Sequence, residues 1–570
     1  MDILPTTDKK KTTIFLILFV AAVFYFWHLS RPDIITDESS YAVRAIGMVD
    51  FDFGIEQPTP WQWVEKIPPW MRLSFHDHPP LVFLLQHYSI RLFGETPFAV
   101  RLPSVLAGLA SIVLVYLIGK QLYQPVVGLA AAALFAFTVN HVWISRIGLQ
   151  ESIAIAFMLA SAYFFLRGLQ NPRWFMAAGA LLGLAFLAKY YILILVPIFV
   201  SLLFVSQHSI YAYDRKHVWS WRFWLALTAL FIAVASPVII YNIQLYRNFG
   251  HFDFQFSQLF GQEVKEWPSR PGQEVLGSYG ERMRAYLPRL IESNSPYFLA
   301  LAAIGLATVL IQLVRRRGLV ISHSSLVIVF LWLLPFLILI GPAHRFLTLL
   351  TPWLAIAAGY AIVTLIRERR AAIAVVAALV IIEALYAYNS VIALDPIGSR
   401  PWAYSYLRRQ ANSWGFNELN DYLDAELAGK MPDPAITFEF PFASEILKQA
   451  VADGRQRKLQ PVSAAIVYND NINLSSQLWV FLRRIIYQGW PVVSAENFRR
   501  GGAVEFLRSA GVKRVYFINA TEAALQDRTR PPTPDGDIME TELGAEGLRP
   551  REIKNPRGEV VFKLYEFELK

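Results

Sequence analysis

Long apolar segments with very few charges dominate the sequence. Clear examples occupy positions 15–29, 105–122, 223–241, 326–340 and 371–388. Each approaches the roughly 20 apolar residues with which an α-helix crosses a bilayer. Of the 570 residues, 55% are hydrophobic and 17% are charged, whereas about a quarter of the residues in a soluble protein are charged. We therefore expect an α-helical polytopic membrane protein.

The basic residues between the apolar segments predict how the chain crosses the membrane. Loops rich in lysine and arginine stay in the cytoplasm, so the lysines at 9–11 place the N-terminus there. The short basic loops 215–222, 315–317 and 367–370 then all fall inside if the chain crosses about 11 times. This topology puts the C-terminal region outside the cell membrane. It also explains the net charge of +9 without nucleic acid as a partner.

Two other regions have a different composition. The segment "PPLVFLLQHYSIRLFG" at 79–94 is too short to span and is expected to lie on the outer surface as an interfacial helix. From residue 394 polar residues increase, and "FNELNDYLDAEL" alternates with the strand-like runs "AITFEF", "SAAIVY", "VKRVYFIN" and "VVFKLYEF". The sequence thus predicts a transmembrane domain at 1–393, with outer loops at 30–103 and 245–296, and a soluble extracytoplasmic α/β domain at 394–570.

In this topology, acids and bases collect at the outer ends of several helices. The residues are Asp37, Glu38, Tyr41, His76, Asp77, His78, Arg146, Glu151, Lys189, His344 and Arg345. Charges at membrane depth are costly and usually face a cavity or a partner, so we expect one polar site in the outer leaflet. Lysine and arginine suit a phosphate group, and carboxylates suit a general base or a cation. The sequence has no P-loop and no GxGxxG motif, so no nucleotide cofactor is expected.

Several of these motifs resemble a known superfamily. "ITDESSYA", which contains Asp37, is similar to the acidic motif in the first outer loop of protein O-mannosyltransferases and lipid A aminoarabinose transferases. "HDHPPLVFLLQHYSIRLFGETPFAVRLPS" resembles the His/Lys-Pro-Pro segment of the same proteins. "SRIGLQESIAIAFMLASAYFFLRGL", "GLAFLAKYYILILVPI" and "HRFLTLLTPWLAIAAGY" also resemble it. The resemblance extends over about residues 10–390 and covers none of the C-terminal region.

The resemblance implies a GT-C glycosyltransferase that moves a sugar from a polyprenyl-phosphate donor to a protein, lipid or glycan acceptor, with inversion. Asp37 matches the catalytic general base, and Glu38 matches the supporting acid beside it. His78 matches the histidine before Pro-Pro, and Lys189 matches a lysine near the lipid phosphate. Arg345, followed by phenylalanine where tyrosine is usual, and Arg146 complete the expected phosphate contacts. Tyr41, Glu151 and His344 are expected to support them.

Metal use stays open in this resemblance. The aminoarabinose transferases have Glu-Lys before Pro-Pro, where the glutamate helps to hold a metal, whereas the mannosyltransferases have histidine there. His76 and Asp77 are therefore the candidate ligands of a divalent cation such as Mg, Mn or Zn.

Structural readings compete with these assignments. Asp37 and Glu38 would also suit a helix N-terminus beside Thr36, and "HDHPP" would suit a turn. Arg146 would equally suit an ordinary anchor on the outer side, and Glu151 would suit an ion pair with Arg146 or a helix cap. Two other function classes compete as well: a transporter or flippase of a lipid-linked substrate, and a membrane scaffold with an outer binding domain.

Overall fold

The computed structural model describes residues 7–51, 59–208, 221–265, 267, 277–315, 321–433, 441–472, 474–525 and 532–569. Two compact units share them. The helical unit comprises Met1–Leu29, Arg72–Gly94 and Phe98–Ala411, and the mixed unit comprises Ser30–Met71, Glu95–Pro97 and Asn412–Lys570. The mixed unit thus joins most of the first outer loop to the C-terminal residues, whereas the sequence suggested one division at residue 394. The division into a membrane domain and a soluble domain stays a prediction.

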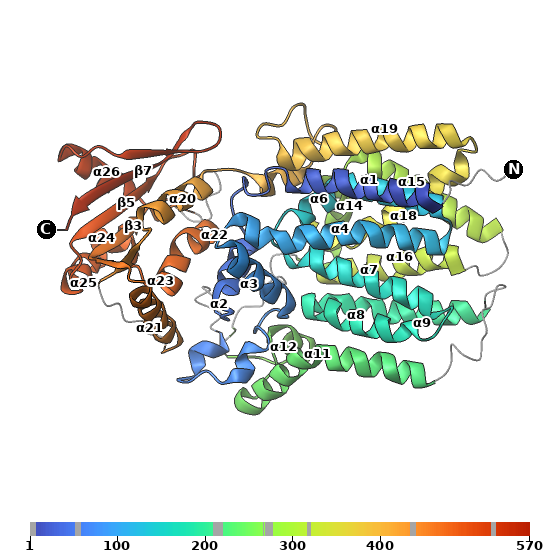
Figure 1. Ribbon diagram of the computed structural model, residues 1–570, viewed down its shortest axis with the longest axis horizontal. Helices are drawn as coiled ribbons and strands as arrows, with labels where there is room; N and C mark the ends of the chain where they lie inside the picture. Colours follow the sequence, from blue (N-terminus) through green and yellow to red (C-terminus); the bar gives the residue numbers. More distant parts are fainter. Residues whose placement is uncertain are drawn as a thin grey trace. The chain divides into compact units, whose positions relative to one another are not determined.

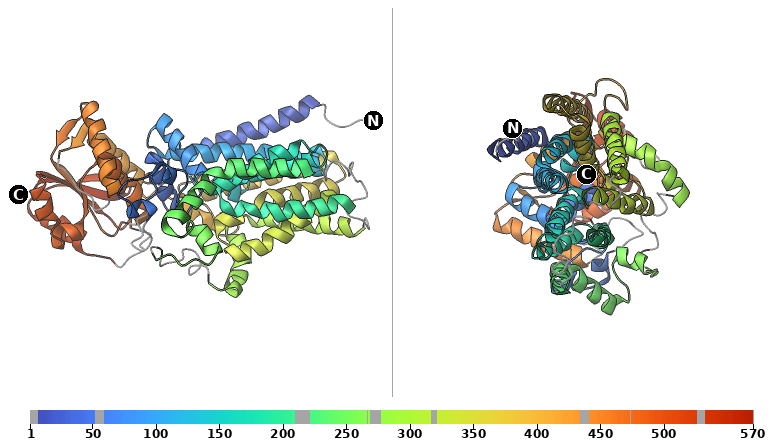
Figure 2. Two further views of the ribbon diagram at one scale, coloured as in Figure 1. Left: turned by 90° about the horizontal axis from the view of Figure 1, so that it is seen from below. Right: turned by 90° about the vertical axis from the view of Figure 1, so that its right-hand side faces the viewer.

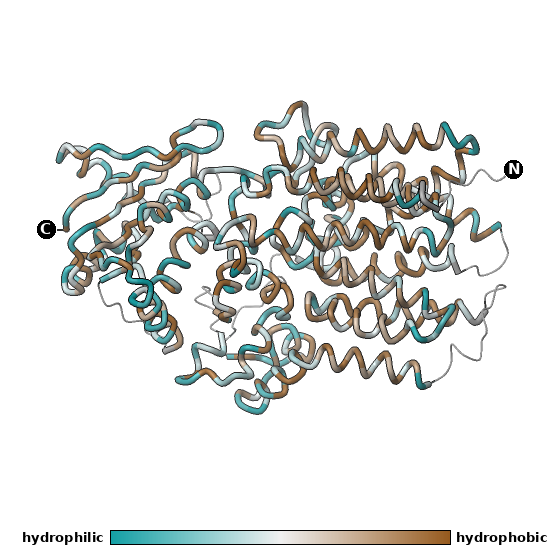
Figure 3. The backbone as a smooth tube through the Cα atoms, viewed as in Figure 1, coloured by the Kyte–Doolittle hydropathy of each residue, from teal (hydrophilic) through white to brown (hydrophobic). Residues whose placement is uncertain are grey.

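The helical unit is built from long apolar helices. Its elements are α1 (Thr7–Phe26), α3 (Leu81–Phe93), α4 (Pro97–Leu122), α5 (Pro125–Phe137), α6 (Val139–Ser145), α7 (Gln150–Gly168), α8 (Trp174–Ala188), η3 (Tyr190–Ile194), α9 (Leu195–His208), α11 (Trp221–Phe249), α12 (Phe254–Leu259), α14 (Tyr279–Glu292), α15 (Pro296–Arg315), α16 (Ile321–Ile340), α17 (His344–Leu347), α18 (Thr351–Leu365), α19 (Arg369–Ala387), η4 (Tyr388–Ile392) and η5 (Tyr406–Ala411). The long helices run side by side (Figures 1 and 2). Most of their residues are hydrophobic, shown in brown in Figure 3.

The apolar segments predicted to span are all helical in the structure. Among the described residues, six helices are long and apolar enough to cross a membrane, and a seventh span is formed if α5 and α6, which meet at a 64° bend, are taken together. Four shorter apolar helices accompany them: Leu81–Phe93, Trp174–Ala188, Tyr190–Ser206 and Thr351–Leu365. The expected multi-pass helical architecture is confirmed, and the orientation of the termini stays a prediction.

Small residues let these helices approach one another closely. A Cβ on Gly179 of α8 would lie 2.3 Å from the carbonyl oxygen of Leu227 on α11, and a Cβ on Gly305 of α15 would lie 2.4 Å from the backbone of Ala357 on α18. Such contacts are typical of helix packing in membranes, where van der Waals contact replaces the hydrophobic effect between helices. The pairs α8–α11 and α15–α18 are therefore tightly fixed.

The mixed unit contains a five-stranded sheet with the order β4-β3-β5-β7-β6. Strands β3, β4 and β5 are parallel, whereas β7 is antiparallel to both β5 and β6. The runs "SAAIVY", "VKRVYFIN" and "VVFKLYEF" form β3, β5 and β7, so the predicted α/β region is confirmed. "AITFEF" lies outside the described residues. The elements are α2 (Asp37–Gly47), η1 (Pro60–Trp63), η2 (Pro69–Arg72), α20 (Phe416–Glu426), β1 (Lys430–Pro432), α21 (Pro441–Gln456), β2 (Gln460–Val462), β3 (Ala464–Tyr468), α22 (Leu474–Gln477), η6 (Leu478–Leu482), α23 (Arg483–Gln488), β4 (Val492–Ser494), α24 (Ala495–Arg500), α25 (Ala503–Ser509), β5 (Arg514–Ala520), α26 (Asp535–Ala545), β6 (Arg551–Lys554) and β7 (Val560–Glu568).

Helices cover both faces of this sheet, because its central strands are apolar on both sides. On one face, Leu419 and Leu423 of α20 and Phe481 of η6 pack against Ile466 and Ile518. On the other face, α26 packs against Val467, Val515 and Phe517. Ile35, which precedes the acidic motif in the sequence, belongs to the first of these two cores.

Candidate functional site

Three of the predicted side chains meet at the ends of α7, α8 and α17. Glu151 lies in the first turn of α7, Lys189 follows the last residue of α8, and Arg345 belongs to α17. The Lys189 Nζ and Arg345 Nε atoms lie 3.5 Å and 3.9 Å from the same oxygen, Glu151 Oε1. Lys189 also donates a hydrogen bond of 2.7 Å to Gln150 Oε1. These four residues, the Glu151 cluster, bring two cations to one carboxylate.

The Glu151 carboxylate is fully buried. Within the described part of the chain neither of its oxygens accepts a hydrogen bond, although it lies at a helix N-terminus, where the macrodipole favours negative charge. Buried polar atoms are normally hydrogen-bonded, and exceptions concentrate at functional sites. The two neighbouring cations are therefore held near Glu151 without being fixed by short hydrogen bonds to it.

Arg146 makes a different set of contacts. Its guanidinium donates to the carbonyls of Phe24, Tyr25 and His28, at 3.0 Å, 2.5 Å and 3.4 Å. These carbonyls lie in or beside the last turn of α1, which is where a cationic side chain satisfies the free acceptors of a helix. These contacts tie Arg146 to the end of α1, and the assignment of Arg146 to the donor phosphate stays a prediction.

The segment "HDHPP" forms a turn in which Phe75 N donates to His78 O. Asp77 lies between the two histidines, with its oxygens 3.7 Å from His76 Nδ1 and 3.0 Å from His78 Nδ1. His76 is fully buried, and its ring lies 5.7 Å from that of Trp267. The turn therefore presents two imidazoles and one carboxylate as neighbours, which are donor groups that suit a cation site.

Asp253, which the sequence analysis missed, holds this turn in place. It is fully buried and accepts hydrogen bonds from Tyr190 Oη, Asn242 Nδ2 and Phe256 N, at 3.0, 2.9 and 2.9 Å. Burial raises the pKa of its carboxyl to about 6, and these hydrogen bonds oppose the rise. The next residue, Phe254, donates its N–H to His76 O at 2.7 Å. An aspartate before an apolar helical turn is an N-cap signal that could have identified it.

His344 pairs with the long outer loop. Its Nε2 lies 2.9 Å from Glu292 Oε2 at the end of α14, and its ring packs 5.4 Å from that of Tyr406. Burial lowers the pKa of His344, and the contact with Glu292 opposes this. The part of loop 245–296 that the structure describes therefore contains two short helices, α12 and α14, and α14 is tied to the residue beside Arg345.

The acidic motif begins α2 in the mixed unit. Asp37 is half-buried, Glu38 is fully buried, and Tyr41 on the next turn is buried as well. Thr36, directly before them, has φ 59° and ψ −149° and makes no side-chain cap hydrogen bond. A β-branched residue rarely adopts positive φ, and such strain collects at functional sites. This favours the functional reading of Asp37 and Glu38 over the reading as an ordinary helix N-terminus.

The predicted residues thus fall into two sets. Asp37, Glu38 and Tyr41 belong to the mixed unit, and the remaining candidates belong to the helical unit. Within the helical unit, the structure brings Glu151, Lys189 and Arg345 together. That all the candidates line one polar pocket stays a prediction.

Comparison with known proteins supports the resemblance that the sequence motifs indicate. A family described as dolichyl-phosphate-mannose-protein mannosyltransferase matches residues 77–241. A "Putative mannosyltransferase YkcB" of Bacillus subtilis is 27% identical over 29% of this chain and 23% of its own length. An undecaprenyl phosphate-α-4-amino-4-deoxy-L-arabinose arabinosyl transferase of Pseudomonas paraeruginosa is 26% identical over 41% of this chain and 40% of its own length.

Among solved structures, ArnT from Cupriavidus metallidurans in the apo state matches with a TM-score of 0.49 and 15% identity, over 97% of this chain and 98% of ArnT. The matched region of this chain spans about a quarter of the length of YkcB. The sequence matches confirm the resemblance to the GT-C superfamily of glycosyltransferases. The family match begins at Asp77 and contains His78, Arg146, Glu151 and Lys189, and it excludes Asp37 and Arg345.

Proposed function

We propose that this protein is an integral membrane glycosyltransferase that moves a sugar from a polyprenyl-phosphate donor to an acceptor on the extracytoplasmic face, with inversion. The N-terminus lies in the cytoplasm and the C-terminal region outside in this proposal. The relatives carry names of mannosyl and arabinosyl transferases, and a hexosyl or pentosyl donor follows from them. The acceptor is a protein, a lipid or a glycan.

The observation that carries the proposal is the Glu151 cluster. It lies mostly within the family match at 77–241, and Lys189 and Arg345 approach one buried carboxylate there at 3.5 Å and 3.9 Å. Two cations beside one carboxylate give the cluster a net charge of +1, which favours the binding of a further anion. A phosphate at the head of a lipid is an anion that reaches this depth.

The proposed chemistry divides between one carboxylate, which accepts a proton, and several cationic side chains, which stabilise the leaving group. The acceptor oxygen or nitrogen attacks the anomeric carbon and transfers its proton to Asp37, which acts as a general base. The bond between the anomeric carbon and the phosphate oxygen breaks, and its electron pair leaves with the lipid phosphate. Lys189, Arg345 and His78 stabilise the negative charge on that leaving group. Glu38 and Tyr41 support Asp37, and Glu151 keeps the cations in position.

A divalent cation at His76 and Asp77 is part of the proposal. Imidazole and carboxylate form a donor set that suits Zn or Mn, and the 3.7 Å between His76 Nδ1 and Asp77 Oδ1 fits two ligands of one ion. The bound ion would add positive charge for the leaving phosphate. Unchanged transfer after thorough chelation would exclude a required cation at these residues.

The substitution Asp37→Asn tests the proposed function. Removing one general base lowers a transfer rate about 10²- to 10⁴-fold. The experiment compares cells that lack the protein with cells that express the native protein, Asp37→Asn or the control Asp453→Asn, which changes an exposed aspartate of α21. Mass spectrometry of glycans, glycoproteins and glycolipids should show one sugar modification restored by the native protein and the control, and not by Asp37→Asn. Full restoration by a folded Asp37→Asn protein would refute the mechanism and favour a flippase or a scaffold.

A further inference from the structure

The C-terminal part of the mixed unit holds the segment that leads into the acidic motif. The Asp33 carboxylate accepts hydrogen bonds from Trp414 N, Gly415 N and Asn417 N, at 2.5, 3.2 and 2.8 Å, where α20 begins. In return, Asn417 Nδ2 donates to the carbonyls of residues 30, 31 and 32, at 3.0, 3.2 and 2.9 Å. An aspartate from the first outer loop thus caps a helix that lies about 380 residues later in the sequence.

An apolar contact follows directly after these hydrogen bonds. Ile35 is 4% exposed and packs in the same core as Trp414, Phe416 and Leu419. It lies two residues before Asp37, and the intervening Thr36 is held at positive φ. A strained residue persists only where the surrounding structure fixes the chain on both sides of it. Asp33 and Ile35 fix the chain on the N-terminal side.

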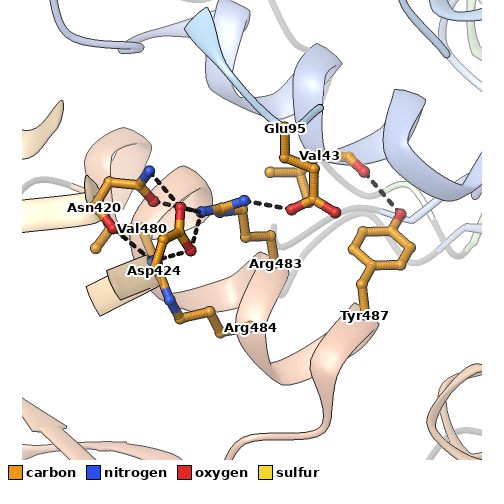
Figure 4. A network of polar contacts seen from close by, with 8 residues as sticks. All are labelled: Val43, Glu95, Asn420, Asp424, Val480, Arg483, Arg484 and Tyr487. Carbon is orange, nitrogen blue, oxygen red and sulfur yellow. Dashed lines mark hydrogen bonds and ion pairs between the residues drawn. The ribbon is translucent and has the colours of Figure 1, made fainter. Parts of the chain in front are cut away.

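Tyr487 fixes the other side. Its hydroxyl donates a hydrogen bond of 2.7 Å to the carbonyl of Val43, in the helix α2 that begins at Asp37 (Figure 4). Its ring fits against Gly47, where a Cβ would lie 2.5 Å from Tyr487 Cε1. The side chain of Tyr487 therefore contacts α2 with both its hydroxyl and its ring.

A polar network on the same helix α23 holds the next part of the outer loop. Arg483 binds Glu95 and donates to Asn420 Oδ1 at 2.6 Å and to both oxygens of Asp424 at 3.0 and 2.8 Å (Figure 4). Arg484 donates to Asn420 O and Asp424 Oδ1 at 2.9 and 2.8 Å, and to the carbonyl of Val480. These five residues, Glu95, Asn420, Asp424, Arg483 and Arg484, form the Asp424 cluster.

We propose that the C-terminal residues 412–570 position the acidic motif, with Tyr487 and Asn417 as positioning residues for Asp37. This inference rests on the proposed function, in which Asp37 is the general base. The two side chains hold α2 and the segment before it from opposite ends, and neither needs to touch a substrate. The C-terminal region is then a required part of the catalytic centre, in addition to any contact with the acceptor.

The physical reason is that a general base tolerates very little displacement. A base must lie within hydrogen-bond reach of the proton that it accepts, and a displacement of about 1 Å can lower a rate about 10²-fold. Loosening α2 should therefore lower kcat, whereas KM for the donor should stay unchanged, because the cations proposed to bind its phosphate belong to the helical unit.

The experiment uses the full-length protein with Tyr487→Phe, which removes one hydroxyl and keeps the ring. The matched control is Tyr565→Phe, which removes the hydroxyl that donates to Glu540 Oε1 at 3.2 Å on the other face of the sheet. Hydrogen exchange of residues 37–47 is measured together with kcat and KM in membranes that contain the native donor lipids. We expect faster exchange of α2 and a kcat about ten times lower in Tyr487→Phe, with KM unchanged and neither effect in the control.

A second variant protects the test against a misleading single substitution. Asn417→Ala removes the three hydrogen bonds to residues 30–32 and should produce the same pattern of fast exchange and low kcat. Unchanged exchange in 37–47 for both variants would refute the positioning role, and so would fast exchange with unchanged kcat. If the native protein transfers no sugar, the proposed function fails, and that result is distinct from either of these exchange outcomes.

Discussion

The Glu151 cluster and the Asp424 cluster use the same residue types in opposite arrangements. In the helical unit, the carboxylate of Glu151 is fully buried and Arg345 is 29% exposed. In the mixed unit, the guanidinium of Arg483 is 1% exposed and the carboxylate of Asp424 is 42% exposed. The first cluster buries its acid beside a buried lysine and a partly exposed arginine, whereas the second buries its cations beside a partly exposed acid.

The distances between the carboxylate and its cations also differ between the two clusters. Asp424 accepts hydrogen bonds of 2.8 to 3.0 Å from both arginines, whereas the cations nearest Glu151 lie at 3.5 and 3.9 Å. Short charge-assisted hydrogen bonds between a carboxylate and a guanidinium fix two chain segments to each other. Cations at longer distances from a carboxylate are held less firmly to it. The comparison therefore separates a structural clamp from a binding site, although both contain arginine beside a carboxylate.

The largest expected effect tests the clamp. Asp424→Ala leaves two buried guanidinium groups with less compensating charge. Because Asp424 itself is 42% exposed, we expect a cost of about 3 kcal/mol, at the low end for a buried pair. Thermal unfolding of the full-length protein should show a midpoint several degrees lower. Asp453→Ala is the control, since it changes an exposed aspartate of α21. Equal midpoints for the two variants would show that the Asp424 cluster does not fix the fold.

The next effect tests the binding site. Lys189→Met keeps the length of the side chain and removes its charge, and a charge-assisted hydrogen bond contributes about 1.5–3 kcal/mol. The affinity for undecaprenyl phosphate should therefore fall about 10- to 100-fold. Lys120→Met, at an exposed position in the last turn of α4, is the control. Native affinity in Lys189→Met would remove this lysine from the donor site.

A smaller effect concerns pH. Burial, together with the neighbouring charge of Asp33, raises the pKa of Glu418 to about 7. The folded state therefore holds this proton more strongly than the unfolded state. Its contribution to stability is complete below about pH 4.5, declines between pH 4.5 and 7, and is lost above that range.

Glu418→Gln should remove this dependence and stabilise the protein at pH 8 by about 2 kcal/mol. Melting curves at pH 5 and pH 8 measure the difference. Glu505→Gln, at an exposed position of α25, is the control. A pH dependence that persists in Glu418→Gln would assign it to another group.

The smallest effect contrasts the two arginines directly. Lysine keeps the charge of arginine but cannot reproduce its planar set of donors. Arg483→Lys should therefore cost about 1–2 kcal/mol in stability, since Arg483 bridges Glu95, Asn420 and Asp424. Arg345→Lys should change the affinity for undecaprenyl phosphate less than about threefold. Unchanged stability in Arg483→Lys together with a large loss of affinity in Arg345→Lys would contradict this contrast between the two arginines.

Local patterns were enough to predict the helices and most strands. Apolar length located the helical segments, and alternation located β3, β5 and β7. The bend between α5 and α6 was missed, because no proline or glycine marks residues 137–139. The sequence around Asp253 is that of an ordinary loop. The sequence around Arg483 and Arg484, "VFLRRII", gives no sign that the two arginines are buried. Burial and pairing decide the role of these residues, and neither is visible in a local pattern.

The grouping of residues 30–71 with the C-terminal region was also beyond local patterns. The bond between Asp33 and Trp414 joins residues 381 positions apart, and a periodicity of two or 3.6 residues contains no information at that range. The identity of Asp37 as a candidate base came from resemblance. The strain at Thr36 and the contacts that surround it came only from the structure.

The distance along the chain between Asp33 and Trp414 has a consequence for biosynthesis. A ribosome makes residues 30–47 early and the residues that hold them last, after every helix between α3 and α19. At about 5–20 residues per second, the acidic loop waits roughly half a minute for its partners. A translation stop anywhere before residue 412 would release an inserted helical bundle without the proposed support of its acidic motif. Synthesis of the residues that hold the acidic motif would then act as the switch that turns activity on.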